Sequence, residues 1–86
     1  MPDLEFNRRR LSILQHLSAG VDRYQEITAL IAGADTRAQA RLAIQELLGC
    51  DEMSAHAITD VQLEQLTKER RDQLAAEIDR LKAITG

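Results

Sequence analysis

Residues 50–67 have the sequence CDEMSAHAITDVQLEQLT and form the most informative helical segment of the chain. Asp51 is a favourable N-cap, so we expect a helix from there to about Leu66. At 100° per residue its apolar positions reach most of the way round the axis, whereas a surface helix of a monomer needs only one apolar stripe. The pattern therefore predicts burial against two neighbours, one within the chain and one on a second molecule.

The segment at the start of the chain has a heptad pattern. From Phe6 its stripe continues through positions 10, 13, 17, 20, 24, 27 and 31, in alternating steps of four and three. We expect one helix from about Leu4 to about Ala32, with Gly33 as its stop. Gly20 lies inside this helix and costs roughly 1 kcal/mol relative to Ala, so it marks a bend or a close helix contact.

Two further helices have clear start signals. Thr36 and Gln39 fit a capping box for a helix of about three turns that ends before Gly49. Thr67 is the expected cap of a last helix. The apolar stripe of that last helix consists of Leu74, Ile78, Leu81 and, at its edge, Ile84. The prediction is a single all-α domain, residues 1–86: an antiparallel helical hairpin, or short coiled-coil arm, of two long terminal helices capped by two shorter ones.

Composition argues against several classes of protein. Cys50 is the only cysteine, so neither an intramolecular disulfide nor a zinc thiolate cluster is expected. No stretch approaches the roughly 20 apolar residues of a membrane span, and we expect a cytoplasmic protein. The net charge is -3, with one Phe, one Tyr and no Trp. Direct DNA binding is therefore expected to be weak or absent, because neither a basic face nor stacking aromatics are present.

Four short segments together resemble a known family. They are ILQHL (13–17), EITALI (26–31), TRAQAR (36–41) and AHAITDVQLEQLT (55–67). In this order they look like the tower and exit-gate (C-gate) segment in the A subunit of bacterial DNA gyrase and topoisomerase IV, the type IIA topoisomerases. The resemblance implies a coiled-coil arm ending in a helical globule, and two such globules meet to close the gate through which DNA leaves. This chain would be such a gate with shortened arms and no enzyme attached.

Four residues depart from the family pattern. Thr59 stands where the pattern has Leu, Gln62 where it has Arg, and Lys68 and Glu69 where it has Gly and Leu. Thr59 and Gln62 make an outward surface more polar. Lys68 makes a sharp break before the last helix less obligatory.

The resemblance implies a non-enzymatic homodimerisation module. Its expected dimer interface consists of Ala55, Ile58, Thr59, Gln62 and Leu63. The expected partners are a second copy and the A subunit of gyrase or topoisomerase IV, whose gate it would modulate. No catalytic residue, cofactor, metal site or small-molecule substrate is expected.

Two alternative functions remain open at this level. One is a helix-turn-helix DNA-binding protein built around the turn at residues 49–51, although the recognition helix would have no Arg or Lys for phosphate or guanine. The other is a generic helical adaptor. An enzyme is disfavoured because titratable residues do not converge in any recognisable constellation.

Several reactive residue types have more ordinary explanations. Tyr24, between Arg23 and Glu26, resembles the surroundings of a topoisomerase's cleaving tyrosine, but its place on the apolar stripe predicts a core residue. His16 and His56 have no nearby ligand, which favours exposed or capping roles over zinc binding. Cys50 is expected to be a small buried hydrophobe.

The basic run at residues 8–10 leaves two interpretations open. Three successive arginines suit DNA phosphates or acidic residues on the last helix. Nearby Asp3 and Glu5 dilute the positive charge, which favours solvated or cross-helix pairing.

Overall fold

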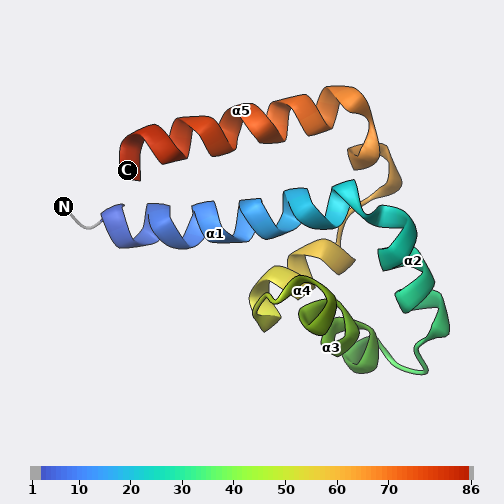
Figure 1. Ribbon diagram of the computed structural model, residues 1–86. Helices are drawn as coiled ribbons and strands as arrows, with labels where there is room; N and C mark the ends of the chain where they lie inside the picture. The colour runs from blue at the N-terminus through green and yellow to red at the C-terminus, as the bar shows by residue number, and fades with distance from the viewer. Residues whose placement is uncertain (1–2, 86) are drawn as a thin grey trace.

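The computed structural model describes residues 3–85, and within that range it contains α-helices, one 3-10 turn and no strand (Figure 1). The predicted all-α class is confirmed. In chain order the elements are α1 (Asp3–Asp22), α2 (Tyr24–Gly33), α3 (Arg37–Leu48), α4 (Glu52–Thr59), η1 (Leu63–Leu66) and α5 (Lys68–Thr85).

The two longest helices, α1 and α5, lie side by side and run in opposite directions (Figure 1). Ile78 and Leu81 are the buried residues of α5, and they pack toward α1. The shorter helices α3 and α4 lie on the other side of α1, with α2 leading into them (Figure 1). The molecule is therefore an arm of two helices joined to a small helical globule.

The core of the globule is where α1, α2, α3 and α4 meet. Its buried residues are Ile27, Ile44, Ala55 and Ile58, with Leu17, Leu47, Leu48 and Cys50 packed around them. Gly20 allows a close approach at this point, because a Cβ built on it would lie 3.1 Å from Cδ1 of Ile58. The close helix contact expected at Gly20 is thus present.

The cap residues predicted from the sequence are confirmed, but the Gln39 side chain accepts from the Asp35 amide at 3.0 Å and not, as in a capping box, from the Thr36 amide. Thr36 accepts a hydrogen bond from the Gln39 amide at 3.1 Å, and Asp51 accepts one from the Ser54 amide at 2.8 Å. Gly49 ends α3 in the left-handed conformation (φ 63°) that favours glycine. Thr67 accepts a hydrogen bond from an amide in the first turn of α5 at 3.3 Å.

The expected single helix over residues 4–32 is wrong, because the chain leaves the helical conformation at Arg23 (φ −115°, ψ 32°). The Arg23 guanidinium donates to both carboxylate oxygens of Glu26, at 2.9 and 2.7 Å, which holds the first turn of α2. After the break, α2 turns away from the arm (Figure 1) and buries Ile27 in the globule. Periodicity could not reveal the break because the apolar stripe continues across it.

The expected helix from Asp51 to about Leu66 is also wrong, since α4 ends at Thr59. The Thr59 hydroxyl donates to the His56 carbonyl at 2.8 Å, and the Asp60 amide donates to the same oxygen at 3.1 Å. Gln62 is extended (ψ 151°) before η1 begins. One straight helix could not make the change of direction by which the chain leaves the globule and reaches α5.

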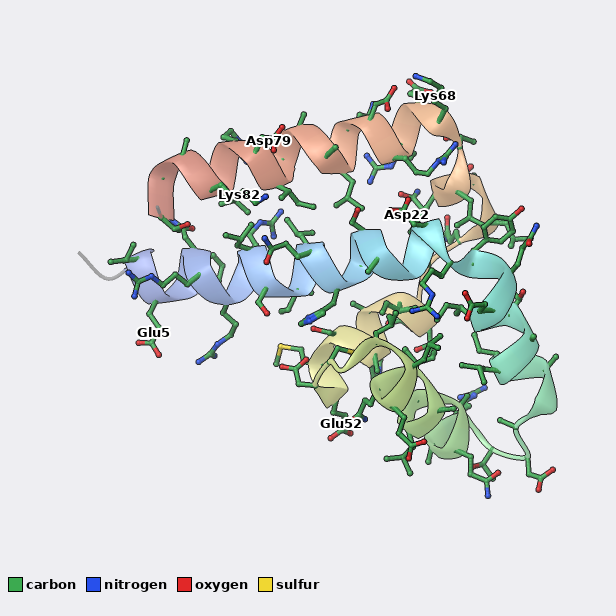
Figure 2. All side chains as sticks on the ribbon, viewed as in Figure 1. Glu5, Asp22, Glu52, Lys68, Asp79 and Lys82 are labelled. Atoms are coloured by element: carbon green, nitrogen blue, oxygen red, sulfur yellow. The ribbon has the colours of Figure 1, made fainter. Side chains whose placement is uncertain are left out.

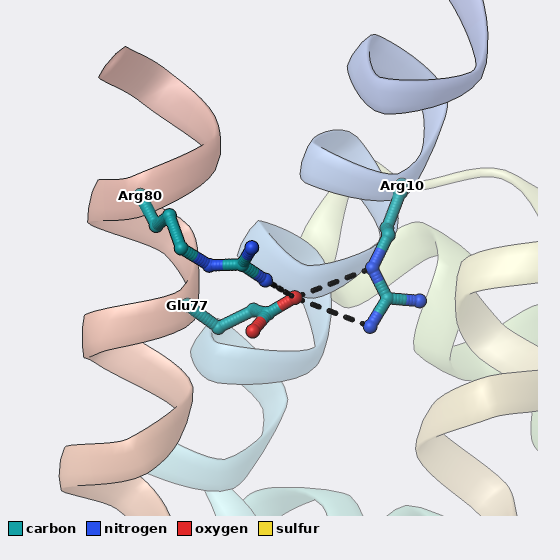
Figure 3. A network of polar contacts seen from close by, with 3 residues as sticks. All are labelled: Arg10, Glu77 and Arg80. Atoms are coloured by element: carbon teal, nitrogen blue, oxygen red, sulfur yellow. Dashed lines mark hydrogen bonds and ion pairs between the residues drawn. The ribbon is translucent and has the colours of Figure 1, made fainter. Parts of the chain in front are cut away.

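The two helices of the arm are joined by one polar cluster in addition to their apolar seam. Oε1 of Glu77 on α5 accepts from Arg10 of α1 at 3.3 Å and lies 2.7 Å from Nη2 of Arg80 (Figure 3). These hydrogen bonds, that of Arg80 first, lower the pKa of Glu77, so the carboxylate stays charged. The cluster defines the register of the two helices, since Arg10 must lie opposite Glu77. It adds little to their stability, because such exposed pairs are weak.

The contact at Gly20 gives a stability prediction. Gly20→Ala should change the free energy of unfolding by less than about 1 kcal/mol, because the gain in helix propensity offsets a tight contact with Ile58. Gly20→Val should destabilise by about 1–3 kcal/mol through overpacking. Urea unfolding followed by circular dichroism measures both, with Gln15→Val at an exposed position of α1 as control. A Gly20→Val variant as stable as wild type would contradict the packing.

Candidate functional site

The five residues expected at a dimer interface divide into two groups. Ala55 and Ile58 are buried in the chain's own core, with 0% and 6% of their surfaces exposed. Thr59 is half-buried, Gln62 is exposed, and Leu63 is 78% exposed. Thr59, Gln62 and Leu63 are therefore the accessible members of the set, while Ala55 and Ile58 anchor α4 to the core.

Leu63 lies at the rim of an apolar hollow of about 80 Å³. Residues of α1, α2, α4 and η1 line it, and they are Gly20, Val21, Ile27, Thr28, Ile31, Ile58, Thr59, Val61, Leu63 and Leu66. The sequence places Ile31 on a buried stripe, but the break at Arg23 leaves it partly exposed at this hollow. Nothing in the periodicity signals its place here. We call the group formed by Ile31, Thr59, Gln62 and Leu63 the Leu63 surface.

A chain of polar contacts holds the start of α4 against α1. Nδ1 of His16 lies 3.2 Å from the hydroxyl of Ser54, a residue that is almost fully buried. The Ser54 amide donates to Asp51 at 2.8 Å. Bonds from the Ser54 amide and then its hydroxyl lower the pKa of Asp51, with a smaller contribution from the charge of His16. His16 is thus a partly buried helix-to-helix contact, not an exposed residue.

The other histidine and the cysteine have structural roles. His56 is exposed near the C-terminal end of α4, and its Nδ1 lies 3.2 Å from the Asp60 carboxylate, as a capping histidine would. Cys50 packs against the core, and partial burial raises the pKa of its thiol. The thiol is therefore protonated at neutral pH, which makes it a poor nucleophile.

Tyr24 does not take the core position expected of it. The break at Arg23 leaves its side chain 44% exposed at the start of α2. Its neighbours Arg23 and Glu26 are engaged with each other, and their hydrogen bond lowers the pKa of Glu26 and raises that of Arg23. The arrangement stabilises the first turn of α2.

Of the three arginines at residues 8–10, one forms an ion pair with the other long helix. Arg10 pairs with Glu77 of α5, as the cross-helix interpretation predicts. Arg9 instead lies 3.8 Å from Glu5 on its own helix, a long contact between exposed side chains. Figure 2 shows that Glu5 projects from the side of α1 that faces away from α5.

Within residues 3–85, no three His, Cys, Asp or Glu side chains lie close enough together to hold a metal ion. None of the helices in the described range combines the length and apolarity needed to cross a membrane.

Comparison with known proteins identifies the kind of segment to which this chain is similar. No protein-family model matches it. The chain is similar to the A subunit of DNA gyrase from Deinococcus deserti (35% identical over 79 residues), Clostridium acetobutylicum (34% over 79) and Streptomyces coelicolor (38% over 74). The alignments cover 92%, 92% and 86% of this chain.

The same alignments cover 10%, 10% and 9% of the three gyrase proteins, so the chain spans about a tenth of the length of the curated relatives it matches. The sequence predicts a resemblance to a small segment of the gyrase A subunit, and these alignments confirm it. Similarity to this segment supports a topoisomerase-related module.

The cap of α4 gives a pH-dependent prediction. Asp51→Ala should cost about 1 kcal/mol at neutral pH, whereas Asp51→Asn should cost less, because asparagine is also a good cap. The folded state lowers the pKa of Asp51 below its ordinary value of 3.8, so the charged form stabilises the fold. That contribution is complete above the ordinary pKa and is lost as pH falls through the lower folded value.

Urea unfolding at neutral pH and at about pH 3 measures this effect. Stability should fall with pH more steeply for wild type than for Asp51→Asn, since their other carboxyl groups are the same. Identical pH dependence in the two proteins would show that the Asp51 charge does not contribute.

Proposed function

We propose that this chain is a non-enzymatic homodimerisation module of the topoisomerase exit-gate type, with α1 and α5 as a short coiled-coil arm and the Leu63 surface as its dimer contact. Similarity to the gyrase A subunit over nearly the whole chain supports the class of module. The main support for this contact is the exposure of Leu63. It is the most exposed large apolar residue among those described, and it lies beside an apolar hollow. Isolated exposed leucines are common, but one beside such a hollow suits association.

The proposed dimer has two-fold symmetry, so each copy offers the same surface to the other. Leu63 of each copy would enter the hollow of its partner, and burying one leucine side chain contributes about 1.5–3 kcal/mol. Thr59 and Gln62 form the polar rim. Ala55 and Ile58 act from beneath by fixing the position of Thr59. A contact of this size predicts a reversible dimer.

Sedimentation velocity over a wide range of concentration tests the proposal. Wild type should associate reversibly, and Leu63→Glu should greatly weaken association because a charge cannot enter the hollow unpaired. Leu42→Glu is the matched control, since Leu42 is an exposed leucine on α3 outside the Leu63 surface. Ile58→Glu is unsuitable because Ile58 is a core residue and its substitution would unfold the monomer.

The result would contradict the proposal if Leu63→Glu and Leu42→Glu associated as wild type does. Circular dichroism of each variant establishes that the fold is retained. Equal losses in both variants would also contradict it, because they would point to general surface hydrophobicity.

The proposal extends to a second partner, the A subunit of an intact gyrase, whose corresponding segment would pair with this chain and be modulated by it in the cytoplasm. The basis is the similarity of this chain to a segment of that protein. The immobilised gyrase A subunit should retain the wild-type chain and release the Leu63→Glu variant. Equal retention of both variants, or of neither, would contradict the exchange of gates. No cofactor takes part in this proposed function.

A further inference from the structure

We infer that the chain has a second self-association surface, in the corner between the arm and the start of α4, and that its occupant is another copy of the same chain. The corner holds a hollow of about 300 Å³. Its lining residues are Phe6, Arg9, Arg10, Ile13, Leu14 and Met53, here called the corner groove.

The corner groove contains large apolar side chains that the fold leaves uncovered. Phe6, the only phenylalanine of the chain, is 63% exposed, and Met53 on α4 is 55% exposed. Ile13 and Leu14 are only half-buried at its floor. Phe6 and Met53 both belong to apolar stripes of the sequence. The fold of a single molecule does not cover the stripes at these two positions. Exposed apolar side chains gathered in a concave corner are typical of an interface.

The two sides of the corner groove carry opposite charge. On α1 the arginine side is Arg9 and Arg10, of which Arg10 is held by Glu77. Arg9 has only the long contact to Glu5 at 3.8 Å, which leaves its guanidinium available. On α4 a separate, shallow hollow of about 490 Å³ is lined by Asp51, Glu52, Met53 and His56, and it shares Met53 with the corner groove. Figure 2 shows Glu52 projecting from α4 on the same side of α1 as Glu5.

This charge distribution selects a second copy as the occupant. The ion pairs found among the described residues do not join the two sides of the groove, so neither side satisfies the other within one molecule. A partner of one charge would be repelled by one of the two sides. A two-fold axis that passes between Phe6 and Met53, perpendicular to the line joining them, instead places the arginine side of each copy against the acidic side of the other.

The corner groove shares no residue with the Leu63 surface, and the inference does not depend on the proposed function. Two separate self-complementary surfaces on one chain build assemblies larger than a dimer. Four proteins separate the two contacts by sedimentation velocity: wild type, Met53→Glu, Leu63→Glu and the double variant.

If both contacts exist, wild type should exceed a dimer at high concentration, each single variant should stop at a dimer, and the double variant should be a monomer. If Leu63→Glu does not change association while Met53→Glu abolishes it, the result supports self-association through the corner groove and contradicts the proposed function. If Met53→Glu associates as wild type does, the corner inference is overturned whatever Leu63→Glu does. Met53 is exposed, so its substitution should leave the fold intact, as circular dichroism would show.

Charge exchange in the Leu63→Glu background tests the pairing itself. Arg9→Glu alone and Glu52→Arg alone should each raise the dissociation constant about tenfold, because the two-fold axis repeats every altered pair. The double exchange should restore most of the affinity. A double exchange no tighter than the single variants would overturn the charge arrangement and, with it, the choice of a second copy as the occupant.

Discussion

Ile58 packs against the backbone of Gly20, and this contact sets how closely α4 lies on α1. Because Gly20 has no side chain, α4 packs directly on α1, with Ile58 only 3.1 Å from where a Cβ would lie. Ile27, Ile44 and Ala55 complete the core around that contact. A chain of 86 residues buries one small core, and Ile58 belongs to it.

The two interruptions of the helices follow from this core. With α4 against Gly20, Ile27 reaches the core only if the chain turns between Asp22 and Tyr24. Likewise, α4 ends at Thr59 because the chain must leave the globule to return along α1 as α5. These turns bring Ile31 and Leu63 to the surface. The candidate interface is therefore a product of the same packing that forms the core.

Features set by neighbouring residues can be predicted from the sequence. The caps at Thr36 and Asp51 and the left-handed Gly49 depend on a few adjacent groups, and each prediction is confirmed. The breaks after α1 and α4 could not be predicted, because apolar spacing is the same whether a helix continues or turns. The prediction for Tyr24 is wrong for this reason: the helix breaks at Arg23, one residue before it, although the apolar spacing continues across the break.

Prediction of the candidate site is limited by the same ambiguity. Residues 55–63 are apolar on more than one side, and the structure buries Ala55 and Ile58 but exposes Leu63. Periodicity identifies apolar positions without saying which neighbour covers them. Phe6 and Met53 show this most clearly, since both lie on apolar stripes and both are exposed at the corner between arm and globule.

In the proposed dimer, the segment after α4 (residues 61–66) is a contact surface and not merely a flexible connection between α4 and α5. Amide hydrogen exchange measured at low and high protein concentration tests it most directly, because association protects only the amides that it covers. Residues 61–66 and the end of α2 near Ile31 should exchange more slowly at high concentration, while the exposed face of α5 should not change. Exchange at residues 61–66 that is independent of concentration would contradict the claim.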